Sequence, residues 1–196
     1  MPLTPAYRLA VWIWIAVGAV WLISAAARKR TVRREGGLGR LAHIVIMVAA
    51  FMLIFPGLPV GYQLPMGPLA GRFTPDSPAV AWTGAALTAA GCAFAVWARL
   101  LLGANWSGRV TLKQDHQLIE RGPYAIVRHP IYTGFLTGLL GAALALGEWR
   151  GLAGWALASI GWGMKSRTEE AFLSEHFGAA YASYRRRVKA LIPFIA

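Results

Sequence analysis

The chain has 196 residues, of which 57% are hydrophobic and only 14% are charged. Soluble globular domains carry about 25% charged residues, so this composition excludes an ordinary soluble domain and indicates a membrane protein. The formal net charge of +12 makes nucleic acid a conceivable partner, and the position of the charges must decide. The single cysteine, Cys92, allows no disulfide within the chain and no cysteine metal cluster, and no metal site is expected.

Five apolar segments predict membrane helices. Residues 7–27, 41–60 and 79–102 are each about the length that crosses a hydrocarbon core of roughly 30 Å. Residues 131–147 and 151–164 are shorter and rich in small side chains, which let membrane helices approach closely, so we expect them to form a tight hairpin. Basic residues follow the first segment, whereas a signal peptide carries them ahead of its apolar run, so we expect a retained helix.

The positions of the basic residues predict the orientation. With five crossings, all of the Lys and Arg residues except Arg8, Arg72 and Arg150 lie on one side of the membrane. The positive-inside rule places that side in the cytoplasm, so the N-terminus is expected outside and the C-terminus inside. Membrane topology and anionic lipids at the cytoplasmic face therefore explain the net charge, and no nucleic-acid partner is expected.

The tail predicts a further, amphipathic helix. Between residues 169 and 188, apolar and aromatic residues recur at helical spacing, while the opposite face is polar. Such a helix can lie on the cytoplasmic membrane surface or fold back over other cytoplasmic segments. The predicted fold is thus an all-α integral membrane protein with about five transmembrane helices, the last two forming a hairpin, and a C-terminal amphipathic helix.

The predicted hairpin brings two polar stretches to one depth. The chain leaves one membrane face near residue 132 and returns near residue 165, so residues 128–132 and the pair Glu169-Glu170 end close together. Taken singly, each has a structural explanation: Pro130 suits a first helical turn, Arg128 can anchor a helix end, and the glutamates suit a helix start. Together they favour a functional site, because ionisable groups at membrane depth are costly.

Two motifs carry a family resemblance. They read HQLIERGPYAIVRHPIYTG at residues 116–134 and EEAFLSEHFGAAYASYRRRV at residues 169–188. Both resemble motifs of the isoprenylcysteine carboxyl methyltransferases and the related phospholipid methyltransferases. The resemblance covers residues 97–196, whereas residues 1–96 show only a hydropathy pattern and no family motif. We therefore expect one membrane domain, residues 1–196, with N-terminal helices at 1–96 and a methyltransferase core with a cofactor pocket at 97–196.

The resemblance implies a membrane-embedded methyltransferase whose cofactor, S-adenosyl-L-methionine, sits in a cytoplasm-facing pocket. Matched by motif, the expected cofactor contacts are His116, Leu118, Ile119, Tyr124, His129, Pro130, Tyr132, Glu169 and Glu170. The expected catalytic residues are Arg167, Glu170 and Arg128. Arg167 would hold the substrate, with Lys165 as the alternative. No glycine-rich strand-to-helix turn supports a soluble Rossmann-type methyltransferase.

The acceptor stays open between several classes. We expect methylation of a carboxylate on a lipophilic or prenylated substrate that enters from the bilayer, and a carboxylate is already ionised near neutral pH. A phospholipid amine or a small thiol is the alternative, and it would use His129 or Glu170 as a base. A sterol-reductase-like protein binding NADPH and a non-catalytic membrane scaffold are further alternatives. The Ala-, Gly- and Arg-heavy composition favours a bacterial inner membrane.

Overall fold

The computed structural model describes residues 3–24, 31–34, 37–56, 67–103, 111–113 and 118–193, and only the backbone of residues 31–34, 37–38 and 111–113. Its elements in chain order are α1 (Pro5–Ser24), β1 (Thr31–Arg34), α2 (Gly37–Ile54), the short 3-10 helix η2 (Gly67–Ala70), α3 (Pro78–Leu102), β2 (Thr111–Lys113), α4 (Pro123–Ile126), α5 (Pro130–Leu146), α6 (Trp149–Phe177) and α7 (Ala179–Arg187). β1 and β2 pair antiparallel.

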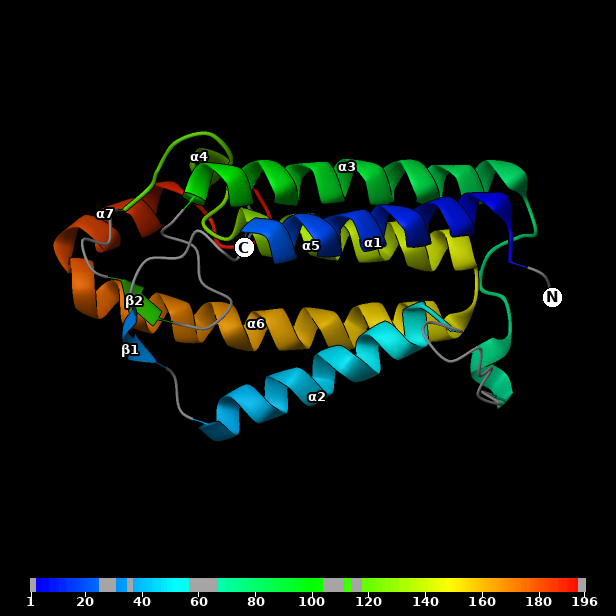
Figure 1. The fold of residues 1–196 in the computed structure, drawn as a ribbon, viewed down its shortest axis with the longest axis horizontal. Coiled ribbons are helices and arrows are strands. Elements are labelled where there is room, and N and C mark those ends of the chain that lie inside the picture. Colours follow the sequence, from blue (N-terminus) through cyan, green and yellow to red (C-terminus); the bar gives the residue numbers. More distant parts are fainter. Residues whose placement is uncertain are drawn as a thin grey trace.

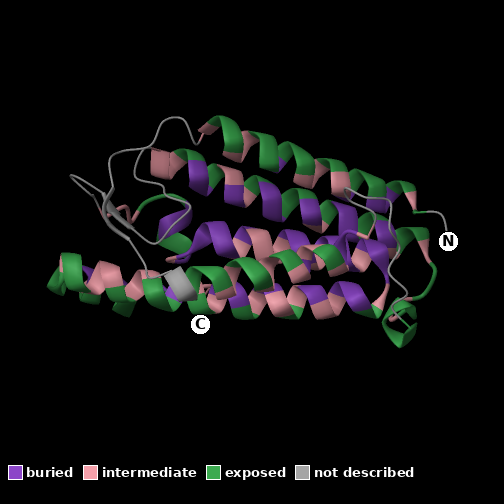
Figure 2. Cartoon of the chain, turned by 60° about the horizontal axis from the view of Figure 1, so that its bottom comes forward, coloured by how far each residue is buried: buried purple, intermediate pink, exposed green. Residues whose placement is uncertain are grey.

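The long helices form one elongated bundle (Figure 1). α1, α3 and α5 lie side by side, α6 runs along them in contact with α5, and α2 packs against α6. The outward faces of the bundle are exposed, while α5 is mostly buried (Figure 2). α4, α7 and the C-terminal ends of α3 and α6 gather at one end, and the N-terminus lies at the other.

Small residues bring α3 and α5 into backbone contact. A Cβ atom added to Gly91 would lie 2.4 Å from the backbone nitrogen of Gly138, and one added to Gly84 would lie 2.5 Å from that of Ala145. Only hydrogen fits at such positions. The hydroxyl of Thr88 donates to the Gly138 carbonyl across the same contact, at 3.2 Å. This close pair fixes α5 against α3, and it thereby fixes the place where the first turn of α5 begins.

The lengths and compositions of the helices agree with a membrane protein. α1 and α3 are long and apolar enough to cross a bilayer, and residues 39–54 and α5 form shorter apolar helices. The predicted segments 79–102 and 131–147 differ from α3 and α5 by one residue at most at each end. A helical architecture with two candidate membrane spans is therefore confirmed in the described residues, together with one short two-stranded sheet that the sequence analysis did not predict.

The predicted division of the C-terminal part was wrong in one respect. A separate amphipathic helix over residues 169–188 was expected, but α6 continues without a break from Trp149 to Phe177. The stretch from 164 to 177 contains no Gly or Pro, so nothing in it interrupts a helix. Gly178 then adopts φ +51° and ψ −120°, a positive-φ conformation that glycine tolerates, and α7 starts in a new direction.

Candidate functional site

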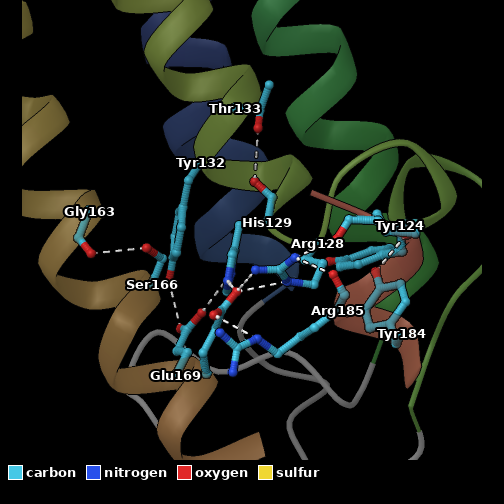
Figure 3. A network of polar contacts seen from close by, with 12 residues as sticks. Tyr124, Arg128, His129, Tyr132, Thr133, Gly163, Ser166, Glu169, Tyr184 and Arg185 are labelled. Carbon is cyan, nitrogen blue, oxygen red and sulfur yellow. Dashed lines mark hydrogen bonds and ion pairs between the residues drawn. The ribbon is translucent and has the colours of Figure 1, made fainter. Parts of the chain in front are cut away.

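Three segments meet where α4, α6 and α7 gather (Figure 3). The first is the turn that leads from α4 into α5, residues 127–133. The second is the part of α6 around residues 162–170. The third comprises α7 and the residues after it. Val127 is extended and ends α4, and Pro130 occupies the first position of α5, where its missing N–H costs nothing.

Arg128 and Glu170 form the central ion pair. Arg128 Nε donates to Glu170 Oε1 at 2.8 Å, and the two side chains are only 8% and 14% exposed. The same guanidinium donates to the backbone carbonyl of Val188. Arg185 of α7 approaches the other oxygen of Glu170, with Nε at 3.5 Å from Oε2. Glu170 therefore forms ion pairs with cations of two separate segments, which joins α6 to both.

His129 lies between the two glutamates. Its Nδ1 is 3.5 Å from Glu169 Oε2 and its Nε2 is 3.3 Å from Glu170 Oε1. Only the protonated ring donates from both nitrogens, so this geometry fits the imidazolium. Burial by itself would lower the pKa of His129, but the hydrogen bonds and negative charges of Glu169 and Glu170 outweigh it, and the pKa is raised.

The glutamates respond in the opposite direction. Burial would raise the pKa of each carboxyl group. For Glu169, the hydrogen bond and charge of His129 outweigh burial, aided by the charge of Lys165 and the hydroxyl of Tyr132, and the pKa is lowered. For Glu170, His129 and Arg128 lower the pKa from 4.5 to about 2. The shifts of the three groups favour ion pairing: two carboxylates face two guanidinium groups, and the raised pKa of His129 favours its imidazolium form beside them.

Stacked rings continue from this cluster into the bundle. The hydroxyl of Tyr132 donates to Glu169 Oε1 at 2.6 Å. The Tyr132 ring stacks on His129, with centroids 5.6 Å apart and planes within 9°, and on Trp162, at 6.2 Å and 19°. Trp162 in turn contacts Phe135 at 5.4 Å. The ionised cluster thus adjoins a flat aromatic wall between α5 and α6.

The other expected contact residues are distributed as follows. Tyr124 is buried in α4, and its carbonyl accepts a 2.6 Å hydrogen bond from the hydroxyl of Tyr184. Leu118 packs on the small apolar cluster formed by Tyr181, Tyr184 and Val188, whereas Ile119 packs on the main core. His116 lies outside the described residues.

Arg167 is not part of the cluster, whereas Lys165 lies on the side of Glu169. Arg167 is exposed, and two residues correspond to about 200° of helical rotation, so it points away from Glu169. Lys165 precedes Glu169 by four residues, which puts both on one face, and its charge contributes to the lowered pKa of Glu169. Of the two candidates for holding the substrate, geometry therefore favours Lys165 over Arg167.

Arg185 and Trp162 were missed as site residues. Arg185 belongs to the run Arg185-Arg186-Arg187, which has the pattern of a solvated helix face, and no signal in the sequence separates it from its neighbours. Trp162 could have been found, because it precedes Glu169 by seven residues, or two helical turns, and therefore shares its face once α6 is known to be continuous.

Comparisons with known proteins found one matching family model and several relatives. The model of the phospholipid methyltransferase family matches residues 79–180, just over half of the chain. Protein-S-isoprenylcysteine O-methyltransferase of Schizosaccharomyces pombe is 39% identical over 98 residues, covering 47% of this chain and 41% of that protein. The B form of Arabidopsis thaliana is 31% identical over 90 residues, covering 44% and 45%. The Saccharomyces cerevisiae protein is 36% identical over 98 residues, covering 47% and 40%. The matched segments span less than half of each of these relatives.

Proposed function

The chain belongs to the phospholipid methyltransferase family, and from this membership we propose that it is an integral membrane methyltransferase that uses S-adenosyl-L-methionine. The observation that carries the proposal is the convergence of the Arg128-His129-Pro130 segment with Glu169 and Glu170 in one ionised cluster. The two polar stretches that carry the family resemblance are thereby joined at one end of the bundle, within hydrogen-bond reach of each other.

The residues present fit the chemistry of this cofactor. S-adenosyl-L-methionine has an ammonium group, a carboxylate, ribose hydroxyls and a flat adenine. Glu169 and Glu170 can accept hydrogen bonds from the ammonium group and the hydroxyls, and Arg128 and His129 can donate to the carboxylate. The cluster holds three cations against two carboxylates, so it can take up a further anionic group. We assign cofactor contacts to His116, Leu118, Ile119, Tyr124, His129, Pro130, Tyr132, Glu169 and Glu170.

The methyl acceptor that suits this cluster best is a carboxylate on a lipophilic substrate. When bound, the cofactor supplies a methyl group that its sulfonium already activates. An amine or thiol acceptor would need a base near neutral pH. The pKa of about 2 makes Glu170 a weak base, and the raised pKa of His129 favours its protonated form, which accepts no proton. A carboxylate needs no base, because it is ionised at neutral pH.

The protein's own residues then bind, orient and exclude water. Lys165, which geometry favours over the expected Arg167, positions the acceptor carboxylate, and Arg128 holds Glu170 ionised. The stacked rings of Tyr132 and Trp162 give the site an apolar wall on the side of the bundle. A substrate of this kind, resembling the isoprenylcysteine that the relatives' names indicate, would enter between helices from the bilayer.

The proposed topology has five crossings, namely α1, α2, α3, α5 and the first part of α6 up to residue 164. α5 and α6 form the hairpin, joined by Gly147 in a left-handed conformation and by Glu148. Arg128 and the arginines of α7 lie at the end with the cluster, whereas Arg72 and Arg150 lie near the opposite end. By the positive-inside rule, we propose that the cluster lies at the cytoplasmic face of the membrane, which we propose to be a bacterial inner membrane, with the α7 arginines facing anionic lipid.

Calorimetry with S-adenosylhomocysteine on the purified protein tests the proposal. We expect binding by the wild type and a loss of about tenfold or more in affinity for His129→Ala and Glu169→Ala, because each removes charge-assisted hydrogen bonds. His176→Ala and Glu175→Ala are matched controls, because they remove the same residue types at exposed positions near the C-terminal end of α6. Binding of NADPH instead would support a reductase, and binding of neither would support a scaffold.

A further inference from the structure

We infer that residues 184–191 form a positioning strap that holds the segment carrying Arg128 and His129 in register with the two glutamates. Thr133 and Tyr184 are the side chains that fasten the strap. The inference rests on the proposed function only in that the positioned site is taken to bind the methyl donor. The strap lies beyond residue 180, where the matched family model ends, and only residues 184–188 of it fall within the second motif; it is argued from the contacts of this chain alone.

Backbone pairing is the first observation. Val127 and Val188 both have extended backbones, with φ −143°, ψ 152° and φ −122°, ψ 132°. Val127 and Lys189 form a parallel bridge. The amide of Arg128 donates to the carbonyl of Lys189 at 2.8 Å, and the amide of His129 donates to that of Ala190 at 3.0 Å. Both amides precede α5, and the strap satisfies them where the helix does not.

Side chains fasten the strap on both sides of His129. The hydroxyl of Thr133, in the first turn of α5, donates to the carbonyl of Leu191 at 2.7 Å and is also 3.3 Å from the carbonyl of His129. On the other side, the hydroxyl of Tyr184 donates to the carbonyl of Tyr124 at 2.6 Å. The strap therefore contacts α4, the turn and the first helical turn of α5.

The strap also contacts the ionised cluster directly. The guanidinium of Arg128 donates to the carbonyl of Val188, and Arg185 lies 3.5 Å from Glu170. Tyr184 and Val188 of the strap form an apolar cluster with Tyr181, against which Leu118 packs. A binding site tolerates displacements of only about 0.5 Å before it loses affinity. Fixing the amides of Arg128 and His129 therefore fixes the origin of two side chains that meet the glutamates.

Two conservative substitutions test the strap. Thr133→Val and Tyr184→Phe each remove one hydroxyl and keep the shape of the side chain. Thr83→Val and Tyr7→Phe are matched controls, because they remove a hydroxyl bond to a carbonyl of 2.9 Å and 2.7 Å, respectively, in other parts of the bundle. Hydrogen exchange of the peptide covering residues 124–133 is measured without ligand, and affinity for S-adenosylhomocysteine is measured separately.

We expect the amides of Arg128 and His129 to exchange at least about fivefold faster in Thr133→Val, Tyr184→Phe and their combination. The change corresponds to about 1 kcal/mol, the net contribution of one hydrogen bond. The affinity for S-adenosylhomocysteine is expected to fall about 3- to 30-fold in the same variants. Neither the exchange rate nor this affinity should change in the controls.

The outcomes separate the strap from the proposed function. Unchanged exchange in the combined variant overturns the strap. Faster exchange with an unchanged affinity for S-adenosylhomocysteine overturns its positioning role. If the wild type does not bind S-adenosylhomocysteine, the proposed function fails. The exchange measurement still tests the strap on its own: faster exchange in the variants supports it, and unchanged exchange overturns it. Tyr7→Phe reports any general loss of stability, because its hydrogen bond is also buried and long-range in sequence.

Discussion

Replacing Glu170 with Gln removes the charge on which the ionised cluster depends while preserving its shape. In the folded protein the pKa of Glu170 is lowered from 4.5 to about 2, a fall of about 2.5 pH units. At about 1.36 kcal/mol per unit, the ionised form is favoured by at most about 3.4 kcal/mol. The side chain retains 14% exposure, so solvent screening reduces this figure, and we expect Glu170→Gln to lower the free energy of unfolding by about 2 kcal/mol at pH 7.

The pH dependence of this loss follows from the direction of the shift. Because the pKa of Glu170 is depressed on folding, its contribution is complete above the unfolded value of about 4.5 and disappears as the pH falls through the folded value of about 2. The difference between wild type and Glu170→Gln should therefore be fully developed at pH 5. It should shrink progressively below pH 4.5.

Equilibrium unfolding in mixed micelles, followed between pH 3 and pH 7, measures this difference. Glu175→Gln is the control, because Glu175 is exposed on the same helix, and we expect it to stay within about 0.5 kcal/mol of the wild type. Two results would refute the reasoning. One is a Glu170→Gln protein as stable as the wild type at pH 7. The other is a stability loss that is the same at pH 3 as at pH 7.

Three further predictions concern the rings, the helix contact and the imidazole. Tyr132→Phe keeps the stacked ring but loses the donor to Glu169, and we expect affinity for S-adenosylhomocysteine to fall about 10-fold in calorimetry; an unchanged affinity would contradict this role. Gly91→Ala places a Cβ against the backbone of α5, whereas Gly18→Ala enters open space; we expect thermal unfolding to show a loss of about 1–3 kcal/mol for the first and none for the second. Because the pKa of His129 is raised, an NMR titration should give a midpoint above 6.5, and its stabilising contribution should be complete below pH 6.5 and lost as the pH rises through that midpoint; a midpoint at or below 6.5 would show that burial dominates.

The bounds of the helices could be predicted closely where a proline marks the beginning of an apolar run. α3 and α5 each begin at a proline, Pro78 and Pro130, and each is an uninterrupted apolar run. The meeting of residues 128–132 with Glu169 and Glu170 could also be predicted, because a helical hairpin of two nearly equal legs returns the chain to its starting depth. The observed contacts between Arg128, His129 and the glutamates have this arrangement.

The continuity of α6 could not be read from composition. Hydropathy falls sharply after Met164, and this fall was interpreted as the end of one helix before another began. A change from apolar to charged residues marks the membrane surface, however, and not a break in the backbone, which needs Gly or Pro. Once α6 is continuous, helical spacing alone separates Lys165 from Arg167, so the ambiguity between them came from the missed continuity.

The strap is a different case, since it depends on carbonyl and amide groups that every residue carries. The contacts of Arg128 and His129 with Lys189 and Ala190 join backbone atoms about 60 residues apart, and such pairing leaves no side-chain pattern to be read. Thr133 illustrates the same point. A threonine in the first turn of an apolar helix commonly bonds back to its own helix, and only the structure shows that its shorter hydrogen bond goes to Leu191.

The charge state of the cluster connects its architecture to its proposed chemistry. An isolated buried charge is expensive, and its usual response is to titrate towards the neutral form. Here the opposite occurs, because every ionised group lies close to a partner of opposite sign and the strap holds the cations in place. Groups held in this way are poor at exchanging protons and well suited to orienting a charged ligand. A reaction that needs alignment of an activated methyl group with an ionised acceptor uses this property directly, whereas one that needs a base would require the cluster to give up the ion pairs that stabilise it.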